Sequence, residues 1–184
     1  MPVHKLTLEV TDPEDGAFFV NKALTRIHGY LHNHNKDNIG LWFQADTIIL
    51  YANELSELEQ ILADDALIHD VNRHIFTSKF EQTDAEITLC KRIRPVCDVQ
   101  RKVRDRIRYI KGKKNKFGMD TEAIEAKRRE LLKYYAKQVE GVKHKYFVIK
   151  TTEKRFTIWV KPVRICNDDF AQQKFNSYGL IGKL

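Results

Sequence analysis

Cysteine is scarce in this sequence, and the cysteines that occur lie far apart. There are three cysteines, an odd number, at Cys90, Cys97 and Cys166. They form no Cys-x-x-Cys pair. This spacing argues against a zinc ribbon or a thioredoxin-like redox motif. Isolated thiols suit the reducing cytoplasm, and we expect a cytoplasmic protein whose cysteines are inert core or surface groups.

Long apolar runs are also absent. No stretch approaches the roughly 20 consecutive apolar residues that a membrane-spanning helix needs. The first residues, MPVHKLTLEV, lack the basic, apolar and small-residue regions of a signal peptide. The chain of 184 residues is 42% hydrophobic and 31% charged, which is typical of a soluble protein with one large domain or two small ones. We therefore expect no membrane partner.

Several catalytic motifs are missing. There is no P-loop, no Gly-x-Ser-x-Gly and no His-Glu-x-x-His. The acidic pairs at 64–65 and 168–169 lie in polar stretches, where solvated turns are a simpler interpretation than the carboxylate cluster of a metal-dependent nuclease. We therefore expect no cofactor and no metal.

Positive charge, in contrast, is concentrated in one segment. The 26 residues 91–116 contain 12 Lys or Arg and 2 Asp, a local net charge of +10, whereas the whole chain carries +7. Such a concentration usually serves a nucleic-acid backbone. A solvated basic face without a partner is the alternative, but the interspersed acidic residues typical of such a face are nearly absent.

The basic segment has the pattern of an amphipathic helix that begins after Pro95. Val99, Val103, Ile107 and Ile110 recur at helical spacing and form an apolar stripe. Cationic side chains follow the same period on another face of this helix: Arg101, Arg104, Arg108 and Lys111. Arginine grips phosphate oxygens and guanine edges in a planar fork, so the helix is suited to a nucleic-acid groove.

The order of expected elements before this helix predicts a ferredoxin-like domain, residues 1–94, in an α+β protein. Alternation and helical spacing predict strands and helices in the order strand, helix, strand, strand, helix, strand: 4–10, 18–32, 39–43, 47–51, 53–63 and 75–81. Residues 64–74 extend the second helix or form a short further one, and 86–93 is another strand. Residues 95–184 form an RNA-binding region with the arginine-rich helix, a helix at 121–139 capped by Asp120, and strands at 146–150 and 155–160.

RNA can be cut without a metal, because its own 2′-hydroxyl attacks the adjacent phosphate once a base removes the proton. Histidine is the side chain best suited to be that base near neutral pH. His28 lies at the junction of the apolar and polar faces of the first expected helix. A histidine in this position is more often structural. A zinc site formed with His32 and His34 is a further alternative, although no fourth ligand lies nearby.

The sequence resembles the CRISPR repeat-RNA endoribonucleases of subtype I-F, which are ferredoxin-like enzymes that cut the precursor of the guide RNA. The matching segments occur in the family's order around the arginine-rich helix: LTRIH at 24–28, NIGLWF at 38–43, YFVIK at 146–150, RFTI at 155–158 and FNSYGL at 175–180. The closing Tyr-Gly-Leu together with the helix histidine is the most specific part.

The resemblance implies roles for particular residues. His28 matches the catalytic histidine, and Tyr178 matches the tyrosine that helps to hold it. The serine that constrains the ribose hydroxyl falls at Thr151 or Thr152, and a threonine hydroxyl can do the same work. Phe156 matches an aromatic residue that stacks on the nucleotide beside the cut, although a core phenylalanine would give the same pattern.

The resemblance also implies the RNA ligand and the products. Arg92 and Arg94 match two linker residues that help to read an RNA hairpin, and the arginine-rich helix would enter the major groove of that hairpin. Cleavage at the 3′ base of the stem would leave a 2′,3′-cyclic phosphate and a mature guide RNA bound in a surveillance complex with other CRISPR-associated proteins. Two other interpretations are a non-catalytic hairpin-binding subunit of such a complex and a DNA-binding accessory protein of a mobile element.

Overall fold

The computed structural model describes residues 2–93, 96–112, 118–136, 145–150 and 155–181. The chain divides into two compact units. The first contains Met1–Arg92 and Lys145–Leu184, and the second contains Ile93–His144. The late strands thus group with the N-terminal residues, whereas the sequence had assigned them to the region of the basic helix.

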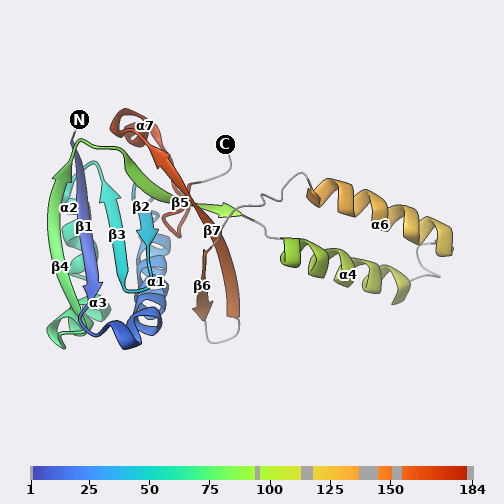
Figure 1. Ribbon diagram of the computed structural model, residues 1–184, viewed down its shortest axis with the longest axis horizontal. Helices are drawn as coiled ribbons and strands as arrows, with labels where there is room; N and C mark the ends of the chain where they lie inside the picture. Colours follow the sequence, from blue (N-terminus) through green and yellow to red (C-terminus); the bar gives the residue numbers. More distant parts are fainter. Residues whose placement is uncertain (1, 94–95, 113–117, 137–144, 151–154, 182–184) are drawn as a thin grey trace. The chain divides into compact units, whose positions relative to one another are not determined.

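The first unit contains a four-stranded antiparallel sheet in the order β2-β3-β1-β4. The elements that build it follow in sequence: β1 (Val3–Val10), η1 (Pro13–Asp15), α1 (Gly16–Asn33), β2 (Gly40–Phe43), β3 (Thr47–Ala52), α2 (Leu55–Leu62), α3 (Asp65–Asn72) and β4 (Phe76–Thr83). This order of elements and strands is that of the ferredoxin-like fold. The predicted fold class is therefore confirmed (Figure 1).

The main core lies between this sheet and the helices α1 and α2. Leu6 pairs with Leu50 across β1 and β3, and Leu8 pairs with Ile48. All four side chains are buried, since alternate residues of a strand share one face. The helices contribute the buried residues Val20, Ala23, Leu24, Ile27, Leu31, Leu58 and Ile61. The helical spacing that predicted a helix at 18–32 thus corresponds to one buried face of α1.

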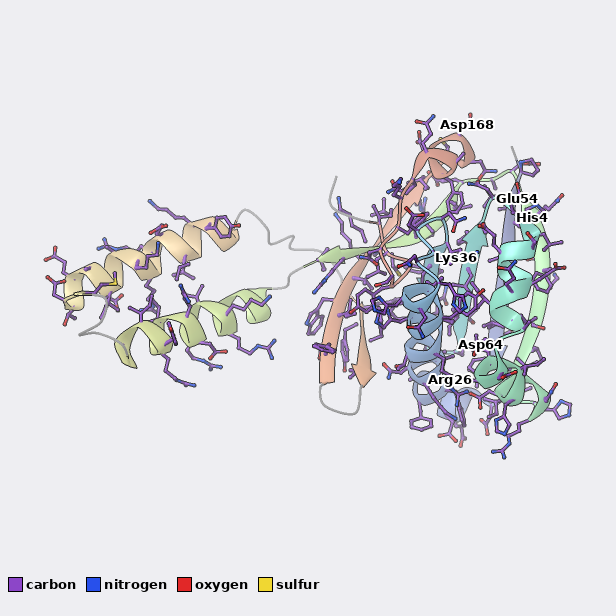
Figure 2. All side chains as sticks on the ribbon, turned by 180° about the vertical axis from the view of Figure 1, so that it is seen from behind. His4, Arg26, Lys36, Glu54, Asp64 and Asp168 are labelled. Atoms are coloured by element: carbon purple, nitrogen blue, oxygen red, sulfur yellow. The ribbon has the colours of Figure 1, made fainter. Side chains whose placement is uncertain are left out.

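A second, three-stranded sheet has the order β5-β7-β6. It is formed by β5 (Ile87–Ile93), β6 (Lys145–Lys150) and β7 (Arg155–Ile165), and α7 (Asn167–Gln172) follows. A separate apolar cluster packs Ile87 and Leu89 of β5 with Phe170 of α7 and Tyr51 of β3. The sequence predicted these strands but not their pairing. It also did not predict α7: the acidic pair at 168–169 was expected in a solvated turn, whereas Asp168 lies in the first turn of this helix (Figure 2).

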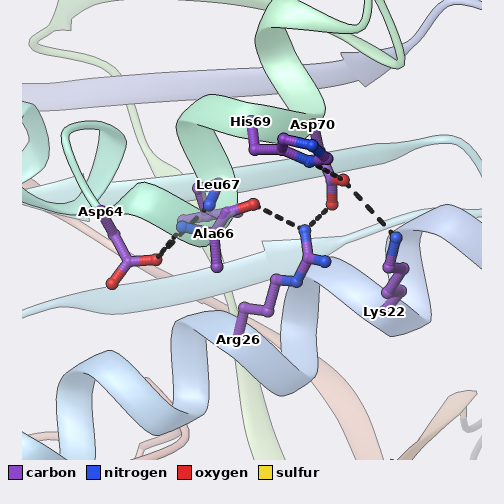
Figure 3. A network of polar contacts seen from close by, with 7 residues as sticks. All are labelled: Lys22, Arg26, Asp64, Ala66, Leu67, His69 and Asp70. Carbon is purple, nitrogen blue, oxygen red and sulfur yellow. Dashed lines mark hydrogen bonds and ion pairs between the residues drawn. The ribbon is translucent and has the colours of Figure 1, made fainter.

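An ionic network joins α1 to α3. Asp64 caps α3 by accepting hydrogen bonds from the backbone N–H groups of Ala66 and Leu67, so residues 65–72 form a short helix of their own (Figure 3). Arg26 of α1 points toward this helix (Figure 3), donates a 2.6 Å hydrogen bond to the carbonyl of Ala66 and pairs with the buried carboxylate of Asp70.

The second unit contains α4 (Val96–Gly112) and α6 (Thr121–Ala136). Val103, Ile107 and Ile110 of α4 are buried with Ile124 of α6. The predicted apolar stripe of the basic helix is confirmed at these positions, while the Val99 side chain lies outside the described residues. Asp120 accepts a 2.7 Å hydrogen bond from Ala123 N–H and caps α6 as expected.

Two of the three thiols are described. Cys90 is fully buried in the main core, and this burial raises its pKa to about 12. Cys166 is exposed. The Cys90 thiol therefore stays protonated at neutral pH, as expected for an inert core group.

Candidate active site

His28 is held by a hydrogen bond between α1 and the C-terminal segment. It is half-buried, and its Nδ1 lies 2.7 Å from the carbonyl oxygen of Ser177. Because a carbonyl oxygen only accepts, Nδ1 carries the proton of the neutral ring and the lone pair lies on Nε2. The contact therefore fixes the tautomer in which Nε2 can accept a proton.

Tyr178 covers one face of the His28 ring. The two ring centroids lie 3.9 Å apart with an interplanar angle of 12°, so the rings are stacked. The tyrosine ring also lies near Phe147 of β6, with 6.5 Å between the ring centroids and an interplanar angle of 59°. The hydrogen bond and the stack together restrict both translation and rotation of the imidazole.

A tight turn holds Tyr178 in this place. The Asn176 side-chain oxygen accepts hydrogen bonds from the backbone N–H groups of Tyr178 (2.9 Å) and Leu180 (3.3 Å). The turn is closed by backbone hydrogen bonds from Gly179 N–H to the Asn176 carbonyl and from Asn176 N–H to the Leu180 carbonyl. The Leu180 side chain is fully buried in the main core, which anchors the turn.

Gly179 is required by both conformation and space. Its φ of +66° is in the left-handed region that residues with a Cβ rarely adopt. A Cβ at this position would lie 2.8 Å from Leu41 Cβ, because Leu41 N–H donates a 2.8 Å hydrogen bond to the Gly179 carbonyl. The Tyr-Gly-Leu motif thus places the tyrosine by docking the turn against β2.

The surroundings of His28 favour its neutral form. Burial lowers the pKa of the imidazole, and the nearby His32 adds to that effect, while the Ser177 carbonyl opposes it. The His32 ring is one helical turn away, with its centroid 5.9 Å from that of His28. A neutral imidazole at neutral pH is the form that a general base needs.

The other predicted active-site residues are only partly described. Thr151 and Thr152 lie outside the described residues. Phe156 lies at the start of β7, in register with Ile149. Its ring is 43% exposed, so the interpretation of Phe156 as a core residue is wrong.

The predicted RNA-binding residues of the basic helix are exposed and line a groove. The groove lies between α4 and α6, has a volume of about 930 Å³ and has an apolar floor that includes Val103 and Ile107. Its cationic lining comprises Arg101, Arg104, Arg108 and Lys111 of α4 and Arg128 of α6. The second unit therefore gathers the predicted cations at one surface.

Of the two linker arginines, one is described. Arg92 is exposed near the end of β5, and Arg94 lies outside the described residues.

Sequence reasoning missed Arg128 and Asn176. Arg128 belongs to the run Lys127-Arg128-Arg129 on α6, a basic cluster that could have been noted. Asn176 shows no such signal, because a side chain that bonds to the backbone of its own turn leaves no periodic pattern.

No group of three or more His, Cys, Asp or Glu side chains among the residues that the structure describes is arranged to hold a metal ion. None of the described helices is both long and apolar enough to span a membrane.

The topology of the main sheet defines a ferredoxin-like α+β protein. The sequence matches the family described as CRISPR-associated protein (Cas_Csy4) over residues 7–183. The chain therefore belongs to this family of CRISPR repeat-RNA endoribonucleases, as its motifs indicated.

Two further comparisons were made. Among solved structures, the chain is similar to Csf5, a CRISPR-Cas type IV Cas6 crRNA endonuclease, at 10% sequence identity and a TM-score of 0.31, covering 89% of each chain. The comparison with curated protein sequences gives no match.

Proposed function

We propose that the chain is a metal-independent endoribonuclease of the subtype I-F kind, which cleaves CRISPR repeat RNA at the 3′ base of its stem-loop. The ligand is the repeat hairpin, and the product is a guide RNA with a 2′,3′-cyclic phosphate at its 3′ end. The enzyme then stays on this product as a subunit of a surveillance complex.

The observation that carries the proposal is the position of His28. Its Nδ1 donates to the Ser177 carbonyl, so Nε2 is the basic atom of the neutral ring. In the proposed step, Nε2 takes the proton of the ribose 2′-hydroxyl. The 2′-oxygen bonds to phosphorus, the bond from phosphorus to the 5′-oxygen breaks, and that oxygen takes up a proton and leaves as a hydroxyl.

The residues near the cut would have the roles that the family resemblance implies. Tyr178 keeps the imidazole in place through the ring stack at 3.9 Å. Thr151 or Thr152 orients the ribose hydroxyl. The exposed ring of Phe156 stacks on the nucleotide beside the cut, an interaction worth about 1–3 kcal/mol.

The groove between α4 and α6 supports the RNA part of the proposal. Its cationic lining complements the phosphate backbone of a stem, and its arginines can also grip a guanine edge in the major groove. A-form major grooves are normally narrow, but the groove of a short stem opens near the helix end. Arg92 and Arg94 would contact nucleobases of the same stem.

Replacement of the base tests the catalytic claim. We expect His28→Ala to lower the single-turnover cleavage rate of repeat RNA by about 100-fold or more, because general-base catalysis supplies that much. The dissociation constant for a non-cleavable 2′-deoxy hairpin should stay within about twofold, since the cationic groove is intact. Gel-based cleavage and filter binding give the two values.

His34→Ala is the matched control. His34 is exposed on the same helical segment, and its Nδ1 bonds to the Tyr30 carbonyl at 2.9 Å, away from the Ser177 contact. The single-turnover cleavage rate of His34→Ala should equal that of the wild type. If the wild-type protein binds the hairpin but does not cleave it, the protein is the non-catalytic hairpin-binding subunit that was the alternative.

A further inference from the structure

The β6 strand lies at an edge of its sheet, since the strand order is β5-β7-β6. Along an antiparallel edge strand, every second residue directs its N–H and C=O away from the neighbouring strand. Val148 is such a residue, because both of its backbone groups bond to α1. Val148 is buried, so its backbone N–H and C=O would destabilise the fold if they had no hydrogen-bond partner.

The partner is the side chain of Asn21. Its Nδ2 donates a hydrogen bond to the Val148 carbonyl at 2.8 Å, and its Oδ1 accepts one from Val148 N–H at 2.6 Å. A primary amide offers the same donor and acceptor as a peptide group, so Asn21 takes the place of a neighbouring strand. The Thr25 hydroxyl lies 3.5 Å from the same carbonyl and adds a weaker contact.

The helix face that holds β6 is the face that holds the histidine. Asn21, Thr25 and His28 follow one another at intervals of about one turn along α1 and therefore lie on one side of it. The same helix thus fixes β6 at one level and presents the candidate base about two turns further along.

We propose that Asn21 is a positioning residue that fixes the register of the β6–β7 hairpin against α1, and thereby the distance between His28 and the hairpin residues that contact the RNA. The proposal rests on the function proposed above. In the sequence, Thr151 and Thr152 follow β6 directly, and Phe156 is paired with Ile149, the residue after Val148.

Apolar packing alone fixes this register loosely. The contacts of the buried Phe147 and Val148 side chains are non-directional, so they set the position of β6 along α1 less sharply than hydrogen bonds do. A slip of two residues would displace the strand by about 7 Å. Two hydrogen bonds to the backbone of one residue, Val148, permit a single position along the strand. A slip of that size would move the hairpin residues out of reach of a nucleotide held at His28.

Asn21→Ala tests this proposal, with Asn33→Ala as the matched control. Asn33 is exposed at the end of the same helix. Both variants replace an asparagine of α1 by alanine, so they share the same change in side-chain size. We expect Asn21→Ala to lower the single-turnover cleavage rate by about 10- to 100-fold, because a displacement of about 1 Å has effects of that order. Binding of the non-cleavable 2′-deoxy hairpin should stay within about twofold in both variants.

Amide hydrogen exchange provides a readout that does not depend on activity. The Val148 amide should exchange faster in Asn21→Ala than in the wild type, and should be unchanged in Asn33→Ala. Asn21→Asp is the second variant, to be used if the alanine variant fails to fold. Aspartate has the same size as asparagine and keeps the acceptor for Val148 N–H, but it lacks the N–H donor for the Val148 carbonyl. We therefore expect Asn21→Asp to lose activity as well.

The outcomes separate this proposal from the proposed function. If the wild type does not cleave, the proposed function has failed. If the wild type cleaves and both Asn21 variants cleave at the same rate with the same Val148 exchange, the positioning role is wrong while the function stands. A loss of hairpin binding in proportion to the loss of cleavage would also contradict it, because the residue would then be generally structural.

Discussion

At the residue scale, the central feature is a histidine whose protonation state is set by its neighbours. The Ser177 carbonyl fixes the tautomer, and burial lowers the imidazole pKa. Sequence spacing could not have separated this arrangement from an ordinary structural histidine. The decisive contact joins α1 to a turn near the other end of the chain, and no local pattern encodes it.

The pH dependence of cleavage follows from this environment. Only the neutral imidazole accepts the proton, so the rate should rise with pH and then level off, with a midpoint below the ordinary pKa of histidine. Single-turnover rates across a pH series measure this midpoint. A rate that falls as the pH rises through this region would contradict the role of His28 as a base.

Substitution of His32 refines the same test. Because His32 contributes to lowering the His28 pKa, His32→Asn should shift the midpoint to higher pH. His34→Asn should leave it unchanged. An unshifted midpoint in His32→Asn would show that the two rings are not electrostatically coupled.

At the element scale, the turn that carries Tyr178 depends on Gly179. We expect Gly179→Ala to lower the free energy of unfolding by about 2 kcal/mol, because alanine resists a positive φ and its Cβ would meet Leu41. Urea denaturation followed by circular dichroism measures this change.

The control for this prediction is Gly29→Ala. Gly29 lies within α1, and a Cβ there would meet no atom within 4 Å. This substitution should stabilise the protein by about 1 kcal/mol through helix propensity. Equal effects of the two substitutions would contradict the special role of the turn.

The ion pair between α1 and α3 is a second element-scale feature. The Asp70 side chain is 2% exposed and pairs with Arg26, while Lys22 is 3.5 Å away (Figure 3). Arg26→Leu leaves the buried carboxylate with only the longer contacts to Lys22 and His69, so we expect a loss of about 3 kcal/mol in unfolding free energy. Chemical denaturation at neutral pH checks the value.

Arg164→Leu provides the comparison. Arg164 pairs with Glu86 at the surface, where the two side chains are 74% and 58% exposed. Its loss should change stability by no more than about 0.5 kcal/mol, because exposed pairs are strongly solvated. A comparable loss in both variants would show that burial of Asp70 does not matter.

Much of the secondary structure could be predicted because the main core is built from regular patterns. The stripe of α1 and the alternation of β1 and β3 correspond directly to buried positions. The pairing of β5 with β7 and the hydrogen bonds of Asn21 could not be predicted, since they join residues far apart in sequence without periodicity. The position of Tyr178 followed only from family resemblance.

At the scale of the whole molecule, charge is distributed unequally between the two units. Residues 93–144 contain 16 Lys or Arg and 7 Asp or Glu, a net charge of +9, so the remaining residues carry −2. This charge is why we propose that the unit with the α4–α6 groove attracts the RNA backbone, whereas the ferredoxin-like unit carries the candidate base.

Salt dependence of RNA binding tests this division. The double substitution Arg104→Ala and Arg108→Ala removes two cations from the groove, so the slope of log K against log salt concentration should become shallower by about 1.5 to 2. Lys79→Ala, in the ferredoxin-like unit, removes an exposed cation and should leave the slope unchanged. Equal slopes for all three proteins would place the RNA elsewhere.

The central claim is that a 2′-hydroxyl, activated without a metal, cuts the repeat RNA. It is tested most directly by incubating the protein in EDTA with two versions of the repeat hairpin, one all-ribose and one with a single 2′-deoxy nucleotide immediately 5′ of the cut. The account predicts that both bind, that only the all-ribose RNA is cleaved, and that its 5′ product ends in a 2′,3′-cyclic phosphate. Cleavage of the deoxy-containing RNA, or a requirement for added divalent metal, would contradict it.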